Sequence, residues 1–187
     1  MPAVAPRTVA RAASDGVIRR ADGLVYLTPL RAQAFLGLVR AGDALARELD
    51  ADLEKEHGLS LRAFEVLLFL AAFAPEGHLR MTELIERTPL SQSRVSRLVA
   101  ELEARGLVVR SAADGDRRGV RVAITHMGTA KFKAAQEGHL ASLERWLFSH
   151  LRDREIAQLA AITAKVLAAQ PRASGGRNRS SGRVAST

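Results

Sequence analysis

The stretch LRMTELIERTPLSQSRVSRLVAELEARGLVVR, residues 79–110, combines two helical patterns, separated by a proline, with a strand-like end. Apolar residues in the second pattern recur at i, i+3, i+4 and i+7, which places them on one helical face. Ser91 is a favourable N-cap for this helix, and Gly106 is a favourable C-cap. The stretch therefore predicts a short helix over 81–88, a break at Pro89, and a longer amphipathic helix. The apolar stripe of this longer helix consists of Val95, Leu98, Val99 and Leu102.

The apolar period changes from 3.6 to 2 after Gly106. The segment LVVR (107–110) is strand-like in composition. In GVRVAIT (119–125), Val120, Val122 and Ile124 alternate with Arg121, Ala123 and Thr125. Between them lies SAADGDRR (111–118), whose Asp-Gly pair is a favourable hairpin turn. The pattern predicts a two-stranded ribbon with an arginine-bearing tip.

Further helices are expected on both sides of this region, over 28–57, 61–74, 126–150 and 153–169. Helix 61–74 is apolar nearly all round, which predicts a core helix. The fold class is therefore mainly α (α+β). Three helices followed by a β-hairpin is the order of a winged helix-turn-helix, with a helical region made by the N- and C-terminal helices.

The polar face of the second motif helix carries the chemistry for reading DNA. In helix-turn-helix proteins, the N-terminal residues of this helix meet base edges in the major groove. A glutamine can bond adenine through two hydrogen bonds, an arginine can read guanine or hold a phosphate, and serines allow the backbone to approach. The predicted DNA-binding residues of the helix are Ser91, Gln92, Ser93, Arg94, Ser96 and Arg97.

Arg117 and Arg118 lie at the tip of the predicted ribbon. A thin ribbon can reach a neighbouring minor groove, where the concentrated negative potential favours guanidinium groups. The alternative is that one of these arginines pairs with Asp114 or Asp116. We expect one arginine to be structural and the other to touch DNA, and Arg118 is the better candidate for DNA.

The composition excludes several other classes of site. With no cysteine among 187 residues, disulfide scaffolds, thiolate zinc sites and cysteine nucleophiles are excluded. The five histidines lack the i, i+4 spacing of a helical metal pair, so we predict no metal site and no cofactor. Phosphate-binding loops, HExxH and GxSxG are also missing from the sequence, and we do not expect an enzyme.

The net charge of +8 is concentrated near the two ends of the sequence. Residues 1–27 carry a net +2 and residues 171–187 carry +4, which leaves +2 for residues 28–170. The segment 171–187 is rich in Gly, Ser and Arg and is expected to be a disordered basic tail. Residues 1–27 are expected to form a flexible extension. A short helix between Val9 and Val25 is an alternative there, although two glycines interrupt it.

No apolar stretch approaches the ~20 residues that cross a bilayer; residues 66–73 are among the longest. We therefore expect a soluble, cytoplasmic protein with no membrane partner.

Three pieces of the sequence resemble, in order and spacing, the MarR family of dimeric bacterial transcription regulators. They are LSLRAFEVLLFL (59–70), the stretch 79–110, and DGDRRGVRVAIT (114–125) followed by HMGTA. The resemblance covers about residues 28–170, which are expected to form one winged-helix domain.

The resemblance implies a division of labour within this domain. Helices in 28–57 and 126–170 would form the interface of a homodimer, and residues 60–125 would bind a pseudo-palindromic DNA operator. Within that part, residues 91–97 would read the major groove, and the two ribbon arginines would serve the wing. The expected protein is a sequence-specific regulator, most often a repressor in this family, that a small-molecule effector releases. The residues of an effector site stay unknown.

An alternative function is non-specific, architectural DNA binding through the arginine-rich segments 1–27 and 171–187. Its signature would be an affinity that falls steeply with salt and differs little between DNA sequences.

Overall fold

The computed structural model of the protein describes residues 16–20, 22–74, 77–113 and 116–170, and it gives the backbone alone for residues 113 and 116–118. The chain divides into two compact units, residues 1–47 and 48–187, and their boundary lies within one long helix. The predicted basic tail, 171–187, lies outside the described residues, as do residues 1–15.

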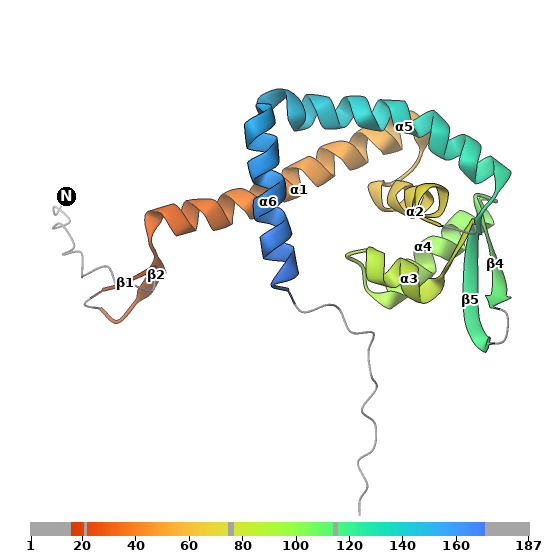
Figure 1. Ribbon diagram of the computed structural model, residues 1–187, viewed down its shortest axis with the longest axis horizontal. Coiled ribbons are helices and arrows are strands. Elements are labelled where there is room, and N and C mark those ends of the chain that lie inside the picture. Colours follow the sequence, from red (N-terminus) through yellow and green to blue (C-terminus); the bar gives the residue numbers. More distant parts are fainter. Residues whose placement is uncertain (1–15, 21, 75–76, 114–115, 171–187) are drawn as a thin grey trace, which may run out of the picture. The chain divides into compact units, whose positions relative to one another are not determined.

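The first unit contains a small antiparallel hairpin and the first part of that long helix. Strand β1 (Val17–Arg19) pairs with β2 (Val25–Leu27), and helix α1 (Pro29–His57) follows. The short helix that was an alternative between Val9 and Val25 is therefore not what the described part of this segment forms, since the structure has two strands there (Figure 1). Gly16 and Gly23 adopt positive φ, which glycine tolerates without steric cost. They bound short runs of β-branched and aromatic residues, which favour strands.

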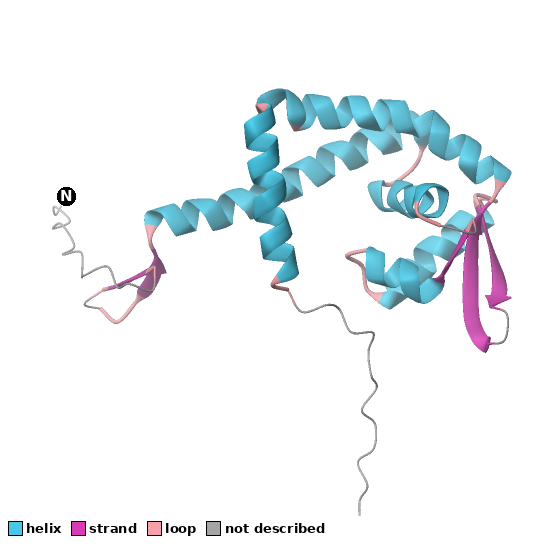
Figure 2. Ribbon diagram, in the orientation of Figure 1, coloured by secondary structure: helices cyan, strands magenta, loops and turns pink. Residues whose placement is uncertain are grey.

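The second unit holds the winged helix-turn-helix that the sequence predicts (Figure 2). After the end of α1 come α2 (Leu61–Ala72), β3 (His78–Arg80), α3 (Met81–Arg87), α4 (Gln92–Ala104), β4 (Val108–Ala113), β5 (Asp116–Ile124), α5 (His126–Trp146), the 3-10 helix η1 (Phe148–His150) and α6 (Asp153–Ala168).

The wing is a three-stranded sheet in the order β3-β5-β4, whereas the sequence predicted two strands. Leu79 of β3 is buried and lies opposite the buried Val122 of β5. Burial of this apolar pair explains why the third strand forms. Because β3 has only three residues, its sequence is too short to show the alternation by which strands are recognised.

Helix α2 forms the centre of the core. Its side chains of Phe64, Val66, Leu67 and Leu70 are at most 2% exposed, as its nearly continuous apolar sequence predicts. Phe64 packs against Phe132 of α5, with ring centroids 5.3 Å apart.

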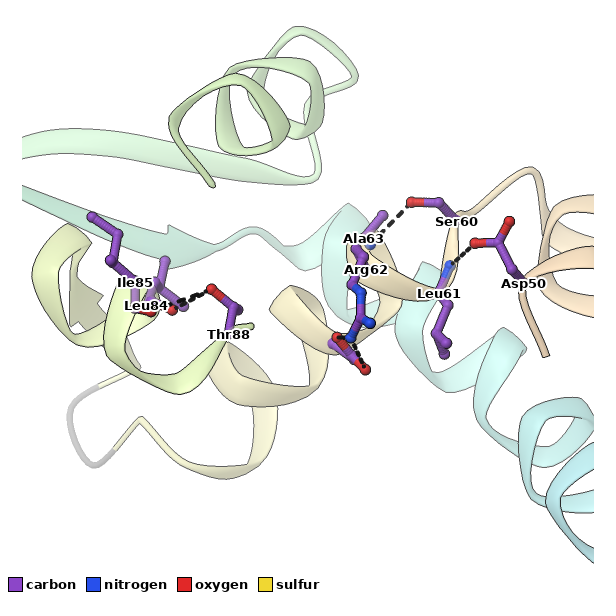
Figure 3. A network of polar contacts seen from close by, with 9 residues as sticks. Asp50, Ser60, Leu61, Arg62, Ala63, Leu84, Ile85 and Thr88 are labelled. Atoms are coloured by element: carbon purple, nitrogen blue, oxygen red, sulfur yellow. Dashed lines mark hydrogen bonds and ion pairs between the residues drawn. The ribbon is translucent and has the colours of Figure 1, made fainter. Parts of the chain in front are cut away.

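The start of α2 is fixed by two side chains (Figure 3). The Ser60 hydroxyl accepts a hydrogen bond from the backbone N–H of Ala63, and the Asp50 carboxylate of α1 accepts one from Leu61 at 2.7 Å. Both satisfy N–H groups that a helix start leaves unpaired.

The junction between the wing and α5 depends on Thr125 and Gly128. The Thr125 hydroxyl donates to the Gly106 carbonyl at 2.7 Å and accepts from the backbone N–H of Gly128 at 2.9 Å. A Cβ at Gly128 would overlap the carbonyl oxygen of Leu107. This close approach explains the glycine in the predicted HMGTA segment.

The predicted helix over 126–150 is shorter than expected. Helix α5 ends at Trp146, Leu147 leaves the helical backbone region, and the chain continues as the 3-10 helix. The side chain of Trp146 is held at this point by a hydrogen bond to Asp52 of α1. A tertiary contact of this kind has no local sequence signal.

Asp52 is the acceptor that ties the end of α1 to α5. One of its carboxylate oxygens accepts from Trp146 Nε1 at 2.9 Å, from Ser142 Oγ at 2.7 Å, and from Arg145 Nη2. Hydrogen bonds from Trp146 and Ser142, together with the Arg145 guanidinium, lower the pKa of Asp52 below its usual value. The ionised carboxylate is therefore favoured in the folded state.

We predict that Asp52→Asn lowers the free energy of unfolding at pH 7 by on the order of 1–3 kcal/mol, because a charged acceptor is lost. A lowered folded pKa contributes stability that is complete above the unfolded value of about 3.9 and is lost as the pH falls through the folded value. The difference from wild type in urea unfolding should therefore shrink below about pH 4. Glu54→Gln, at an exposed position of the same helix, is the control. A difference that stays constant from pH 7 to pH 3 would contradict this role.

Candidate nucleic-acid interface

Helix α4 presents the predicted polar face because its opposite face is buried. Val95, Val99 and Leu102 are at most 1% exposed. With this stripe held in the core, the helical period places the intervening residues outside. The side chains of Ser91, Gln92, Ser93, Arg94 and Arg97 are exposed, and Ser96 is half-buried. The structure thus brings all six predicted residues together at one helix start.

The turn between α3 and α4 is fixed by a buried threonine. Thr88 is 8% exposed, and its hydroxyl donates to the carbonyl of Leu84 at 3.0 Å (Figure 3). Its extended backbone ends α3, and Pro89 follows. The short helix, the break and the longer helix lie where the sequence predicts them.

Ser91 stands at the predicted N-cap position with an extended backbone, yet its hydroxyl makes no capping bond. The hydroxyl lies 3.2 Å from that of Ser93 instead. The first N–H groups of α4 are therefore without a side-chain cap. Such groups at a helix start, where the helix dipole is positive, are suited to an anion such as phosphate.

An open hollow of about 220 Å³ lies beside the start of α4. Guanidinium groups bind phosphate oxygens through paired hydrogen bonds, so a hollow with three arginines is suited to a phosphate. Glu101 is the acidic residue of this lining. The residues that line the hollow are Arg62, Leu90, Arg94, Arg97, Leu98 and Glu101.

Arg62 is a candidate that the sequence reasoning missed. It lies in the first turn of α2 (Figure 3), where the helix dipole disfavours a cation. The Glu65 carboxylate accepts two hydrogen bonds from Arg62 Nη1, at 2.7 and 2.9 Å, and both side chains are partly exposed. The sequence signal that could have identified Arg62 is a basic residue in the first turn of a helix that precedes the helix-turn-helix.

The wing is fastened to α4 by Glu103 and Arg110. The Glu103 carboxylate accepts from Arg110 Nε at 2.7 Å and from the Arg110 backbone N–H at 2.9 Å. These bonds from the Arg110 side chain and backbone lower the pKa of Glu103 below its usual value. The carboxylate therefore keeps its charge, and this contact with it, to lower pH than an isolated glutamate would.

Arg117 and Arg118 belong to β5 by their backbone, as the ribbon predicts, but their side chains are not among those described. Asp114 and Gly115, at the predicted turn, lie outside the described residues. The register of β4 and β5 shifts between Ala112 and Ala113, next to this tip.

Other classes of site find little support in the described part of the chain. Within it, no three His, Asp or Glu residues are grouped so that they could hold a metal ion, and every helix is too short or too polar to cross a lipid bilayer. His139 stacks on Phe64 with ring centroids 4.4 Å apart, and burial lowers the pKa of His139. Burial therefore favours the neutral form of this imidazole, which packs against the aromatic core.

Comparisons with known proteins identify relatives of this chain. Residues 57–119 match the model of the MarR family. A stretch of 100 residues is 34% identical to the HTH-type transcriptional repressor MdtR of Bacillus subtilis (strain 168), covering 54% of this chain and 64% of that repressor. The chain thus matches just under two thirds of that relative's length.

Solved structures agree with this match. The MarR family regulator Sco3205 of Streptomyces coelicolor, in complex with DNA, is 28% identical with a TM-score of 0.75, covering 81% of this chain and 95% of that one. AbsC, another MarR family regulator of Streptomyces coelicolor, is 28% identical with a TM-score of 0.70, covering 78% of this chain and 99% of that one. These relatives are transcriptional regulators, which agrees with the expectation that the chain is not an enzyme.

We predict that Glu103→Gln loosens the base of the wing, because the ionised acceptor for Arg110 is lost. Exchange of the Arg110 backbone N–H with deuterium should become several-fold faster, as read by NMR or mass spectrometry. Glu101→Gln is the control, because Glu101 is exposed on the same helix and accepts no hydrogen bond from Arg110. Equal exchange in wild type and Glu103→Gln would show that the strand pairing alone holds the wing.

Proposed function

Since this chain belongs to the MarR family of transcriptional regulators, we propose that it is a homodimeric regulator that binds double-stranded DNA in a sequence-specific manner. The observation that carries the proposal is the start of α4, where Gln92, Arg94 and Arg97 are exposed and the first backbone N–H groups have no side-chain cap. Polar side chains of this kind at the start of a recognition helix are suited to base edges and phosphates.

Base reading is assigned to the side chains nearest the start of α4. Gln92 can pair with an adenine through its amide, and Arg94 or Arg97 can pair with a guanine. The small Ser91, Ser93 and Ser96 would let the helix approach the groove. Arg117 and Arg118 are proposed to reach the neighbouring minor groove from the wing, with Arg118 the better candidate.

Phosphate binding is assigned to the arginine hollow. Arg62 would hold a backbone phosphate from the α2 side while Arg94 or Arg97 faces the bases. The ion pair with Glu65 keeps the Arg62 guanidinium oriented before DNA arrives. Contacts to phosphates fix the position of a protein on the duplex without reading its sequence.

Exposed apolar faces support the homodimer. On α6, Leu159, Ile162 and Val166 are 37–57% exposed, and their spacing places them on one helical face. Helix α1 carries a similar face, with Phe35 58% exposed. A second copy of the chain would remove these faces from water. A two-fold dimer would then bind half-sites about one helical turn, ~34 Å, apart.

Regulation is proposed by analogy with the relatives. MdtR is a repressor. By analogy, this chain is proposed to repress transcription in the bacterial cytoplasm. A small molecule that alters the spacing of the two recognition helices would relieve the repression. Architectural DNA binding through the terminal segments is the second candidate, and the charge of residues 171–187 is its support.

We predict that Gln92→Ala and Arg97→Ala each cost on the order of 1–3 kcal/mol of binding to a preferred duplex and reduce base preference. Arg62→Ala should weaken binding to all duplexes alike, and it should reduce the salt dependence of the binding constant by about one phosphate contact. The measurement is fluorescence anisotropy on a duplex selected from a random pool and on its scrambled counterpart. Lys133→Ala, an exposed basic position on α5, is the control.

Removal of residues 171–187 separates the two candidate functions. A regulator that reads bases through α4 should lose affinity for both duplexes equally and keep its preference. If the truncation abolishes the preference while Arg97→Ala has no effect, α4 is not the reading surface, and the architectural function is favoured.

A further inference from the structure

The β1–β2 hairpin precedes α1 and has a defined geometry. Arg20 N–H donates to the Leu24 carbonyl at 2.9 Å, and the Asp22 carboxylate accepts from the Leu24 N–H at 3.1 Å. Gly23 supplies the positive φ of the turn. The Thr28 N–H donates to the Gly16 carbonyl at 3.0 Å, which closes the open end of the hairpin.

The hairpin exposes apolar side chains that its own unit does not cover. Leu24, Val25, Tyr26 and Leu27 are 42–52% exposed, and β2 has no fully buried residue. A two-stranded hairpin is at best marginally stable by itself in water, and stability usually comes from packing of an apolar face. The hairpin therefore needs a surface against which to pack.

The exposed surface continues along the first part of α1. Phe35, Leu38 and Val39 are 45–58% exposed, and Leu30 is 77% exposed. Together with the hairpin and Leu36, the described part of the first unit exposes nine large apolar side chains at about half of their area. They lie on more than one face, because successive residues of β2 alternate in direction. If all nine were covered, each copy would bury on the order of 800 Å², the amount in an interface of standard size.

We propose that the β1–β2 hairpin is a dimerisation arm, which packs its apolar side chains against the first unit of a second copy of this chain. The inference rests on the proposed homodimer and extends the interface beyond the helices. Related by a two-fold axis, the two first units would bury the same surface in each copy.

The charges of the hairpin favour a second copy over a nucleic acid. Arg20 pairs with Asp22 at 3.5 Å and lies 5.7 Å from the centre of the Tyr26 ring. The arginine is thus engaged within the hairpin. An apolar strand beside a paired cation fits an equally apolar protein surface better than a phosphate backbone.

The first test is the dimer dissociation constant by sedimentation. The triple variant Val25→Thr, Tyr26→Thr and Leu27→Thr removes apolar surface and keeps residues that favour strands. We expect its dissociation constant to rise at least about tenfold because buried apolar area is lost. Arg19→Gln, an exposed position on the same hairpin, should change it less than about twofold, since a surface polar contact contributes little.

The second test uses Tyr26, the one tyrosine of the sequence. Nitration by tetranitromethane should slow as the protein concentration rises and the dimer forms. In the α6 variant Ile162→Asp, which weakens the proposed helical interface, nitration should stay fast to higher concentration.

The outcomes separate the arm from the proposed function. A wild-type protein that is monomeric at micromolar concentration would overturn both. A wild-type dimer with unchanged association in the triple variant, and with nitration that does not depend on concentration, would overturn the arm alone.

Discussion

Burial of Val95, Val99 and Leu102 is the constraint on which the rest of the interface depends. Each such side chain contributes on the order of 1.5–3 kcal/mol when it leaves water. Turning α4 about its axis would expose this stripe, so the rotation of the helix is fixed by the core. The exposure of Arg94 and Arg97 follows directly, because the helical period places them away from this stripe. Gln92, three residues before Val95, is exposed because it is the first residue of the helix.

Polar contacts then place the neighbouring elements around α4. Glu103 holds the base of the wing through Arg110, and Thr125 joins the end of the wing to α5 through the Gly106 carbonyl. Asp52 joins the end of α1 to α5. The second and third of these contacts connect residues 19 and 94 positions apart in the sequence.

Much of this fold could be predicted from the sequence because its signals are local. The amphipathic spacing of α4, the apolar run of α2 and the change of period after Gly106 each occur within a few residues. Strand β3 and the β1–β2 hairpin could not be predicted so well, because three-residue strands show no reliable alternation. The end of α5 depends on a contact between Trp146 and Asp52, 94 positions apart in the sequence.

In the candidate site too, residues with a local sequence signal could be predicted and a residue brought in by the fold could not. The six residues of α4 were predicted because they share one helix, while Arg62 reaches the hollow from α2 and was missed. The contacts that any of them make with DNA stay predictions. The most direct test compares wild-type dissociation constants for a selected duplex and its scrambled counterpart at physiological salt. A regulator that reads bases through α4 should prefer the selected duplex by about a thousandfold or more. Equal affinity for both duplexes would contradict this function.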